Sequence, residues 1–367
     1  MIGDLDVSEA LIVRGGSAPT PSASPTVIAG KPGNGCGRVV HKYGRFVEIT
    51  QGGSAARAST VAASNRVPAD FRQPPTETEQ IGRAAFALRI SPAFREAKDE
   101  RVRVQCGWGF RRRDASPSHV RYAAPGGPKR GPEAPTSDRM SGRVAVCAIL
   151  VSGPGSDLHI SNDETIEIAA QVQHGLSWLA SLSNENPLTW LYDFRRIEIE
   201  LPASATSVDD FETMERPWRD AALRKMGEKP GHEGIRTYGR RMRRHLKADR
   251  VYVAFFTKYP LAHFAYAFVG GPHLVMDTTA GEWGLANLDR VFAHETCHIF
   301  GAADEYAESG CDCGGRWGVD GISNANCENC NPTPEPCIMR RNEAAMCEHT
   351  WRQIGLGGMA RSSPGIV

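Results

Sequence analysis

The sequence predicts an α+β fold, in which a mixed, twisted sheet packs against a helix that carries two histidines and precedes a cysteine-rich C-terminal subdomain. Three observations predict it. After residue 141, apolar runs of strand length are interspersed with segments of helical spacing. Residues 285–300 have an apolar stripe with helical periodicity and contain no residue that breaks a helix. Seven of the ten cysteines lie between Cys297 and Cys347.

The elements of this region follow one another clearly along the chain. Residues 144–151 form a short apolar run typical of a buried strand, and residues 164–182 have the apolar spacing of a helix. Residues 264–269 alternate large and small side chains with a period of two, which indicates another strand. The remaining expected elements are a strand at 188–201, a basic and partly helical segment at 221–246, and strand-like runs at 251–256 and 273–276.

The first part of the chain has weaker signals. Residues 1–35 are rich in Ser, Pro, Gly and Ala, and we predict a disordered N-terminal tail there. Short apolar runs within residues 36–122, at 38–40, 45–50, 81–90 and 102–106, indicate a small, strand-containing N-terminal region. Residues 123–140 contain too much Gly and Pro to continue an element, so we interpret them as a linker. The main domain is then expected over residues 141–358.

Composition excludes several classes of protein. Residues 1–139 carry 21 Lys and Arg against 13 Asp and Glu, which we interpret as a solvated basic surface; we expect no nucleic-acid partner, because no recognisable nucleic-acid-binding fold accompanies it. No run of eighteen apolar residues occurs, so no membrane-spanning helix is expected. The first residues are acidic and lack the apolar core of a standard signal peptide.

The chemistry is concentrated in a short segment that begins at His294. It reads His294-Glu-x-x-His298, followed by Gly301 and Asp304. Two histidines four residues apart on a helix project from one face, close enough to hold one metal ion, and Glu295 falls beside that ion. Glycine often takes the left-handed conformation that ends a helix, so the chain is expected to turn at Gly301 and bring Asp304 back as a third ligand.

This pattern resembles the zinc-binding signature of the metzincin metallopeptidases, in the variant with aspartate as third ligand found in the snapalysin family. Asp304-Glu305-Tyr306 is also similar to the bacterial IgA-peptidase-like metallopeptidases. Cys337-Ile338-Met339, followed by Cys347, is similar to the methionine turn of reprolysins. The resemblance is close over residues 285–355, less than a fifth of the chain, and agreement in element order extends back to about residue 141.

The resemblance implies a metzincin-like (zincin) catalytic domain over residues 141–358 and a zinc-dependent endopeptidase acting on a protein or peptide substrate. The Zn²⁺ ligands would be His294, His298 and Asp304, with Glu305 as the less favoured third ligand. Glu295 would be the general base that takes a proton from the attacking water. Met339 would form the methionine turn.

Several interpretations remain open beside this one. The chain could be a catalytically silent, zinc-containing binding or adhesion module, or a metal-dependent hydrolase of a non-peptide amide. The strand at 264–269 is either the sheet edge that pairs with an extended peptide or an internal strand with no ligand role. We expect a monomer. The family implies secretion, whereas the lack of a recognisable signal peptide leaves a cytoplasmic location open.

The cysteine-rich segment needs staples, because it has too few apolar residues to build a core of its own. By analogy with reprolysins we favour disulfides, although sequence alone does not reveal their pairing. The alternative is a second, structural zinc on Cys311, Cys313, Cys327 and Cys330. Cys297 is expected to be a buried thiol. Residues 36–122 form a candidate propeptide, in which Cys36 or Cys106 would cover the metal as in the cysteine switch of matrixins.

Overall fold

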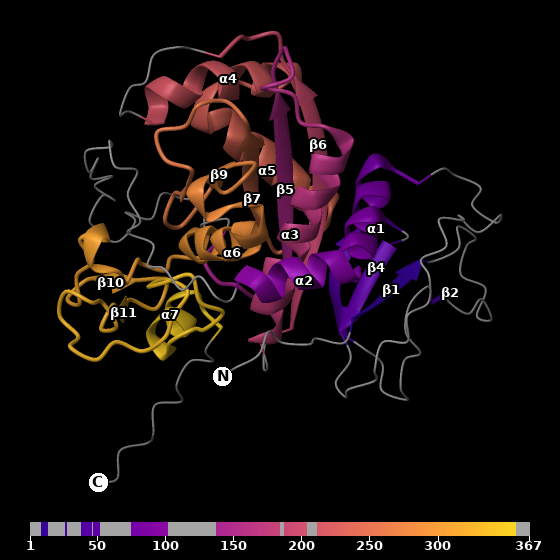
Figure 1. Cartoon of the computed structure of the whole chain (residues 1–367). Helices are drawn as coiled ribbons and strands as arrows, with labels where there is room; N and C mark the ends of the chain where they lie inside the picture. Colours follow the sequence, from indigo (N-terminus) through magenta and orange to yellow (C-terminus); the bar gives the residue numbers. More distant parts are fainter. Residues whose placement is uncertain are drawn as a thin grey trace.

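A computed structural model of the chain describes residues 9–13, 26–27, 38–45, 47–51, 75–101, 137–183, 187–203 and 211–356 (Figure 1). Within these residues the fold is a mixed sheet flanked by helices, followed by a C-terminal segment with little regular structure. The predicted mixed sheet with helices is therefore confirmed, although the mostly parallel strands make the fold mixed α/β rather than α+β, and the metzincin-like fold remains a prediction. None of the helices among the described residues is both long and apolar enough to cross a membrane.

One sheet organises the described part of the chain, in the order β2-β1-β4-β3-β6-β5-β7-β9-β8. Its five central strands are parallel, and antiparallel strands complete both sides. The parallel strands are β3 (Arg38–Tyr43), β6 (Leu188–Glu198), β5 (Gly142–Ser152), β7 (Arg250–Thr257) and β9 (His273–Asp277). The antiparallel strands are β1 (Glu9–Val13), β2 (Thr26–Val27), β4 (Val47–Gln51) and β8 (Ala265–Ala267).

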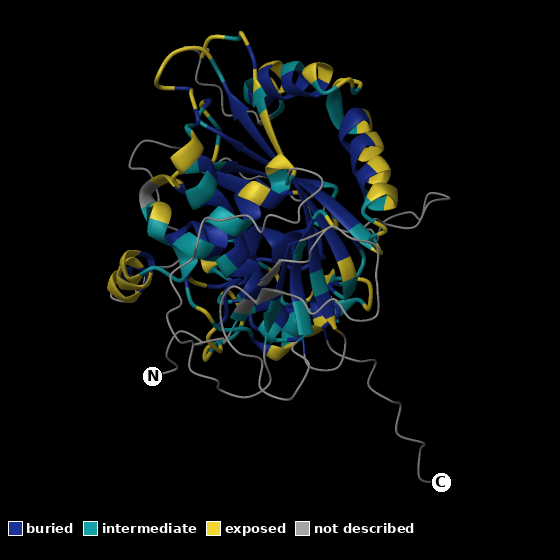
Figure 2. Ribbon diagram, turned by 90° about the vertical axis from the view of Figure 1, so that its right-hand side faces the viewer, coloured by how far each residue is buried: buried dark blue, intermediate teal, exposed yellow. Residues whose placement is uncertain are grey.

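Helices cover both faces of this sheet. On one face lie α1 (Glu77–Arg89), α3 (Asn162–Ser181) and α6 (Leu288–Ile299), and on the other lie α4 (Phe211–Lys225) and α5 (Gly231–His245). Strand β5 shows why both faces need cover: all nine residues from Val144 to Ser152 are buried, with alternate side chains entering the two cores. A continuous apolar run of this kind is typical of a parallel strand packed on both sides. Figure 2 shows buried residues along the sheet and exposed ones on the outer sides of the helices.

The N-terminal region joins the same sheet. The apolar runs at 38–40 and 45–50 give β3 and β4, as expected, and β3 pairs with β6 of the main domain. The run at 81–90, expected in a strand-containing region, instead forms α1, which is followed by α2 (Pro92–Arg101). A reciprocal capping box between Thr76 and Glu79 starts α1, and this Thr-x-x-Glu pattern was a helix signal in the sequence.

Two other N-terminal predictions fare differently. Within residues 1–35, expected to be disordered, Glu9–Val13 form β1, which pairs with β4, and Thr26–Val27 form β2, which pairs with β1, so the prediction is wrong for these residues. Pairing with an existing edge explains the strand, because the sheet supplies the partners that a tail lacks. Cys36, Cys106 and most of the linker at 123–140 lie outside the described residues. The propeptide remains a prediction.

The C-terminal segment lies below α6 in Figure 1. It contains the two-stranded pair β10 (Arg316–Trp317) and β11 (Ile322–Ser323), and the short helix α7 (Glu348–Gln353). Leu356 and Ile354, after α7, are buried in the same core as α6. The cysteine-rich segment is thereby attached to the helix that carries the two histidines.

Candidate metal centre

Helix α6 presents His294 and His298 from a buried position. A 3-10 turn, Leu285–Asn287, leads into it, so the helix expected at 285–300 is confirmed. Val291, Phe292 and Ile299 anchor the helix in the core. Apolar packing, rather than helix propensity, holds a short helix of this kind in place.

Gly301 ends the helix, as the sequence predicted. Its φ is +94°, and a Cβ at this position would lie 2.8 Å from the Cα of Gly318. Both the left-handed backbone at Gly301 and the close approach of the backbone at Gly318 therefore require glycine. The turn returns the chain towards the helix, and Asp304 reaches the two histidines.

The three predicted metal donors meet at one point. The Nε2 atoms of His294 and His298 are 3.1 Å apart, and each lies 3.2 Å from Oδ1 of Asp304. All three residues are buried. These atoms form one of the groups in the described residues whose geometry could hold a metal ion.

The hydrogen bonds of the ring nitrogens indicate the tautomer of each imidazole. Nδ1 of His294 lies 3.0 Å from the carbonyl oxygen of Ile338, and Nδ1 of His298 lies 2.9 Å from that of Ala302. A carbonyl only accepts, so both Nδ1 atoms donate, and in the neutral rings both Nε2 atoms carry lone pairs. Two lone pairs and the Oδ1 of Asp304 then face one another, and this oxygen has no hydrogen-bond donor among the described residues.

The electrostatics of the group favour positive charge at its centre. Burial lowers the pKa of His298, but the Asp304 carboxylate outweighs burial and raises it to about 9. Burial raises the pKa of Asp304, whereas the two histidines hold it well below its usual range. A proton or a metal ion would compete for the same Nε2 lone pair.

Glu295 lies beside this group with one free carboxylate oxygen. Its side chain is buried, and Oε2 has no hydrogen-bond partner among the described residues. Burial raises the pKa of Glu295, while His294 and His298 act in the opposite direction. His263 also lowers it. Sequence reasoning missed His263, because only the folded chain brings the loop before β8 close to α6.

Glu305, the alternative third ligand, belongs to a different set of contacts. Its carboxylate accepts hydrogen bonds from Asn326 (2.6 Å), Thr350 (2.8 Å) and the Cys347 thiol (3.0 Å). In this structure Asp304, not Glu305, therefore accompanies the two histidines.

Met339 is fully buried in a segment linked to the candidate centre through the backbone. Its carbonyl accepts a hydrogen bond of 2.9 Å from the Glu305 amide, and the preceding residue, Ile338, accepts from His294. The predicted methionine-turn segment thus supports both a histidine and the loop that carries Asp304.

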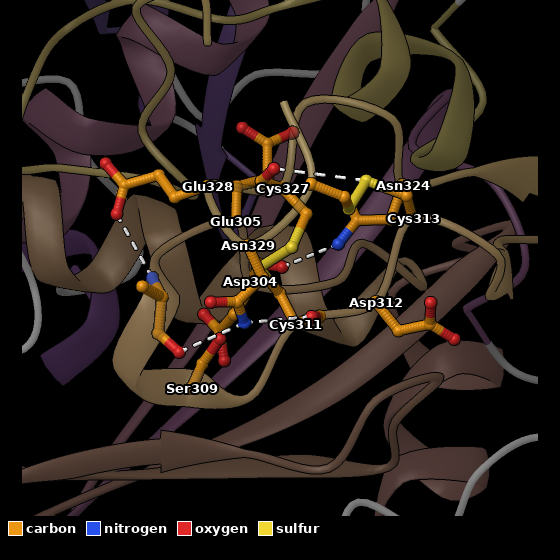
Figure 3. The surroundings of a disulfide bond; sticks show 12 residues. Asp304, Glu305, Ser309, Cys311, Asp312, Cys313, Asn324, Cys327, Glu328 and Asn329 are labelled. Atoms are coloured by element: carbon orange, nitrogen blue, oxygen red, sulfur yellow. Dashed lines mark hydrogen bonds between the residues drawn. A yellow bond between two sulfur atoms is a disulfide. The ribbon is translucent and has the colours of Figure 1, made fainter. Parts of the chain in front are cut away.

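Two pairs of cysteines staple the loop after this centre. Cys311 is bonded to Cys327 and Cys313 to Cys330, so the expected disulfides are confirmed for these four residues (Figure 3). Three of these cysteines, Cys313, Cys327 and Cys330, also form a group that could hold a metal ion, so the alternative of a structural zinc on the four cysteines remains a prediction. Cys297 is a buried free thiol, as expected, and Cys337 and Cys347 are also free.

The strand predicted at 264–269 is shorter than predicted, and of the two alternatives for it the structure favours the sheet edge. Residues 265–267 form β8, which ends the sheet and pairs with β9 alone among the described strands. The turn after it contacts the candidate centre, because the Gly270 amide donates to the carbonyl of His298 at 2.9 Å.

Searches of protein-family models and of curated proteins found no match to this chain.

Proposed function

We propose that this chain is a zinc-dependent endopeptidase with a metzincin-like catalytic domain. The observation that carries the proposal is the convergence of His294, His298 and Asp304, whose donor atoms are 3.1–3.2 Å apart. Zinc–nitrogen and zinc–oxygen bonds of about 2.1 Å in a tetrahedral site place neighbouring donors roughly 3.4 Å apart, so the residues fit this ion. Three protein ligands leave a fourth position for water or substrate.

Glu295 supplies the proton transfers. A zinc ion in this site would lower the pKa of a water molecule and polarise the scissile carbonyl. Glu295 takes a proton from the attacking water and passes it to the leaving amine. Its Oε2 has no hydrogen-bond partner among the described residues, and burial raises its pKa, which favours transient protonation of this carboxylate. Ile338 and Ala302 hold the two imidazoles in the tautomer that directs Nε2 to the ion.

The sheet edge next to α6 supports a peptide substrate. The carbonyl of Phe264 and the amide of Phe268 both bond towards β9. In an antiparallel pair the direction alternates along the strand, so the backbone groups of Ala267 point away from the sheet. An extended peptide could pair with this edge, close to the turn that contacts His298.

The two alternative functions make different predictions. A catalytically silent zinc module has no need of a base, so the presence of Glu295, with its Oε2 lacking a hydrogen-bond partner among the described residues, argues against it. A hydrolase of a non-peptide amide would use the same donors and base, and only the edge strand favours a peptide over such a substrate.

The deciding experiment combines metal content with casein cleavage in wild type, Glu295→Gln and His298→Ala. We expect Glu295→Gln to keep the metal content of wild type but to lose about 10²- to 10⁴-fold in cleavage rate. His298→Ala should lose one metal equivalent and all cleavage. Glu48→Gln, a buried glutamate on β4 at the far side of the sheet, is the matched control and should resemble wild type.

Other outcomes separate the alternatives. Metal binding without cleavage of casein by wild type would favour the binding module. Cleavage of small N-acyl amides, but not of casein, would favour the non-peptide hydrolase. Cleavage that is unchanged in Glu295→Gln would overturn the assigned mechanism.

A further inference from the structure

A second cluster of donors lies on the other side of the Asp304 loop. It consists of Glu305, Cys337 and Cys347, all buried, from three segments that are distant in sequence. One ligand atom from each residue lies within 4.8 Å of the others. Cys347 caps the start of α7, and Glu305 directly follows Asp304.

The hydroxyl of Thr350 contacts all three residues of this cluster. It donates to Oε1 of Glu305 at 2.8 Å, and the sulfur atoms of Cys337 and Cys347 lie 3.3 and 3.6 Å from it. Four donors therefore converge on one small volume. Tetrahedral zinc sites are built from four donors of this kind, although a hydroxyl ligand is less usual than a thiolate.

The burial of the Glu305 carboxyl group without a cationic partner among the described residues is the second observation that points to a ligand. The carboxylate is fully buried, and its hydrogen bonds come from an amide, a hydroxyl and a thiol, which are all neutral. No Lys, Arg or His among the described residues forms an ion pair with it. Buried carboxylates are normally paired with a cation or bound to a metal.

We propose that Glu305, Cys337 and Cys347 form a second metal site, independent of the histidine site, for a divalent thiophilic cation such as Zn²⁺. Two sulfurs and one carboxylate oxygen suit zinc better than calcium or magnesium, which prefer oxygen alone. Binding releases the two thiol protons to solvent and leaves two thiolates on the ion. Thr350 or a water molecule completes the coordination.

An ion at this site would stabilise the positions of two ligands of the candidate catalytic centre, Asp304 and His294. Glu305 is adjacent to Asp304, and Cys337 precedes Ile338, whose carbonyl orients His294. The ion would therefore fasten the loop of one ligand to the segment that supports another. A disulfide between Cys337 and Cys347 would also join these segments, but both thiols are free in this structure, and bridging them would leave Glu305 with one donor fewer.

Cobalt is the probe that separates the two sites. In Co²⁺-loaded full-length protein, thiolate ligands give an intense near-ultraviolet charge-transfer absorption, and the histidine site contains no sulfur. We expect this absorption in wild type and in His298→Ala, and its loss in Cys337→Ser/Cys347→Ser. Cys147→Ser removes a buried free thiol on the other face of the sheet, and should leave the absorption unchanged.

A second variant guards against misfolding of the double mutant. Glu305→Gln keeps both sulfurs and most hydrogen bonds but removes the charge, so the affinity for Co²⁺ at the sulfur site should fall by about tenfold or more. Absence of the absorption in wild type, or its persistence in the double variant, would overturn the proposal. So would a Cys337–Cys347 disulfide in non-reducing peptide maps of the purified protein. None of these three results depends on cleavage activity. Failure of the second-metal-site proposal is therefore distinct from failure of the peptidase proposal.

Discussion

The two ends of α6 carry two buried charge clusters that are built differently. At its start, Asp289 is paired with Arg101, with Lys98 at 3.0 Å and with His174 at 2.6 Å. Lys98 and Arg101 also donate to the carbonyl of Ala286 at 2.6 and 2.7 Å. At its end, the donors of His294 and His298 face Asp304, which has an oxygen without a donor.

The difference shows which buried cluster requires something from outside. The Asp289 cluster contains its own cations, supplied by α2 of the N-terminal region, and its charges are compensated within the protein. The Asp304 cluster consists of acceptors when both imidazoles are neutral, because both Nδ1 atoms donate to carbonyls, so a proton or a metal ion has to supply positive charge at the Nε2 atoms. Burial of uncompensated charge is expensive. Of the two clusters on α6, this favours a bound ion at the Asp304 cluster and not at the Asp289 cluster.

The largest expected effect concerns the Asp304 cluster. Asp304→Asn removes the negative ligand, so we expect loss of one metal equivalent and a loss of cleavage beyond the roughly 10- to 100-fold that substitutions outside the ligand set cause. Metal analysis and casein cleavage measure this. Asp289→Asn should keep its full metal content; if it loses metal as Asp304→Asn does, the two clusters are not independent and the comparison fails.

The next effect concerns stability at the compensated cluster. Asp289→Asn leaves Lys98 and Arg101 buried without their counter-charge, which should lower the free energy of unfolding by about 3–5 kcal/mol. Urea unfolding of the full chain measures it. Asp157→Asn, at an exposed position, is the control and should change the free energy of unfolding by no more than about 0.5 kcal/mol. An equal effect of both variants would show that the buried ion pairs contribute nothing specific.

Local patterns in the sequence predicted the histidine site better than the rest of the molecule. His294 and His298 share a face because of helical periodicity, and Gly301 turns the chain, so the three donors follow from the eleven residues 294–304. The Asp289 cluster and the group of Glu305, Cys337 and Cys347 join segments far apart in the chain, and only the fold brings these together. The capping box of Thr76 and Glu79 was readable, but the apolar run after it was assigned to a strand-containing region.

The smallest expected effect is the pH dependence of the Asp289 cluster. Burial raises the pKa of Asp289, but Arg101, Lys98 and His174 hold it well below its usual range. A carboxyl with a depressed folded-state pKa stabilises the fold above its unfolded pKa of about 3.9, and the contribution is lost as the pH falls towards the folded value. The wild type should therefore lose its advantage over Asp289→Asn below about pH 4, by at most about 1.4 kcal/mol per pH unit.

Titration of His174 does not interfere with this comparison of wild type and Asp289→Asn. Burial lowers its pKa, and Asp289 opposes burial, so removal of Asp289 can only lower the His174 pKa further. The wild type then gains relative to the variant as the pH falls through the range in which histidine titrates, and the gap cannot shrink there. Urea unfolding of both proteins at pH 7, 5 and 3 measures the gap. A gap that is as wide at pH 3 as at pH 5 would mean that Asp289 does not act through its charge, and the contrast between the two ends of α6 would lose its electrostatic basis.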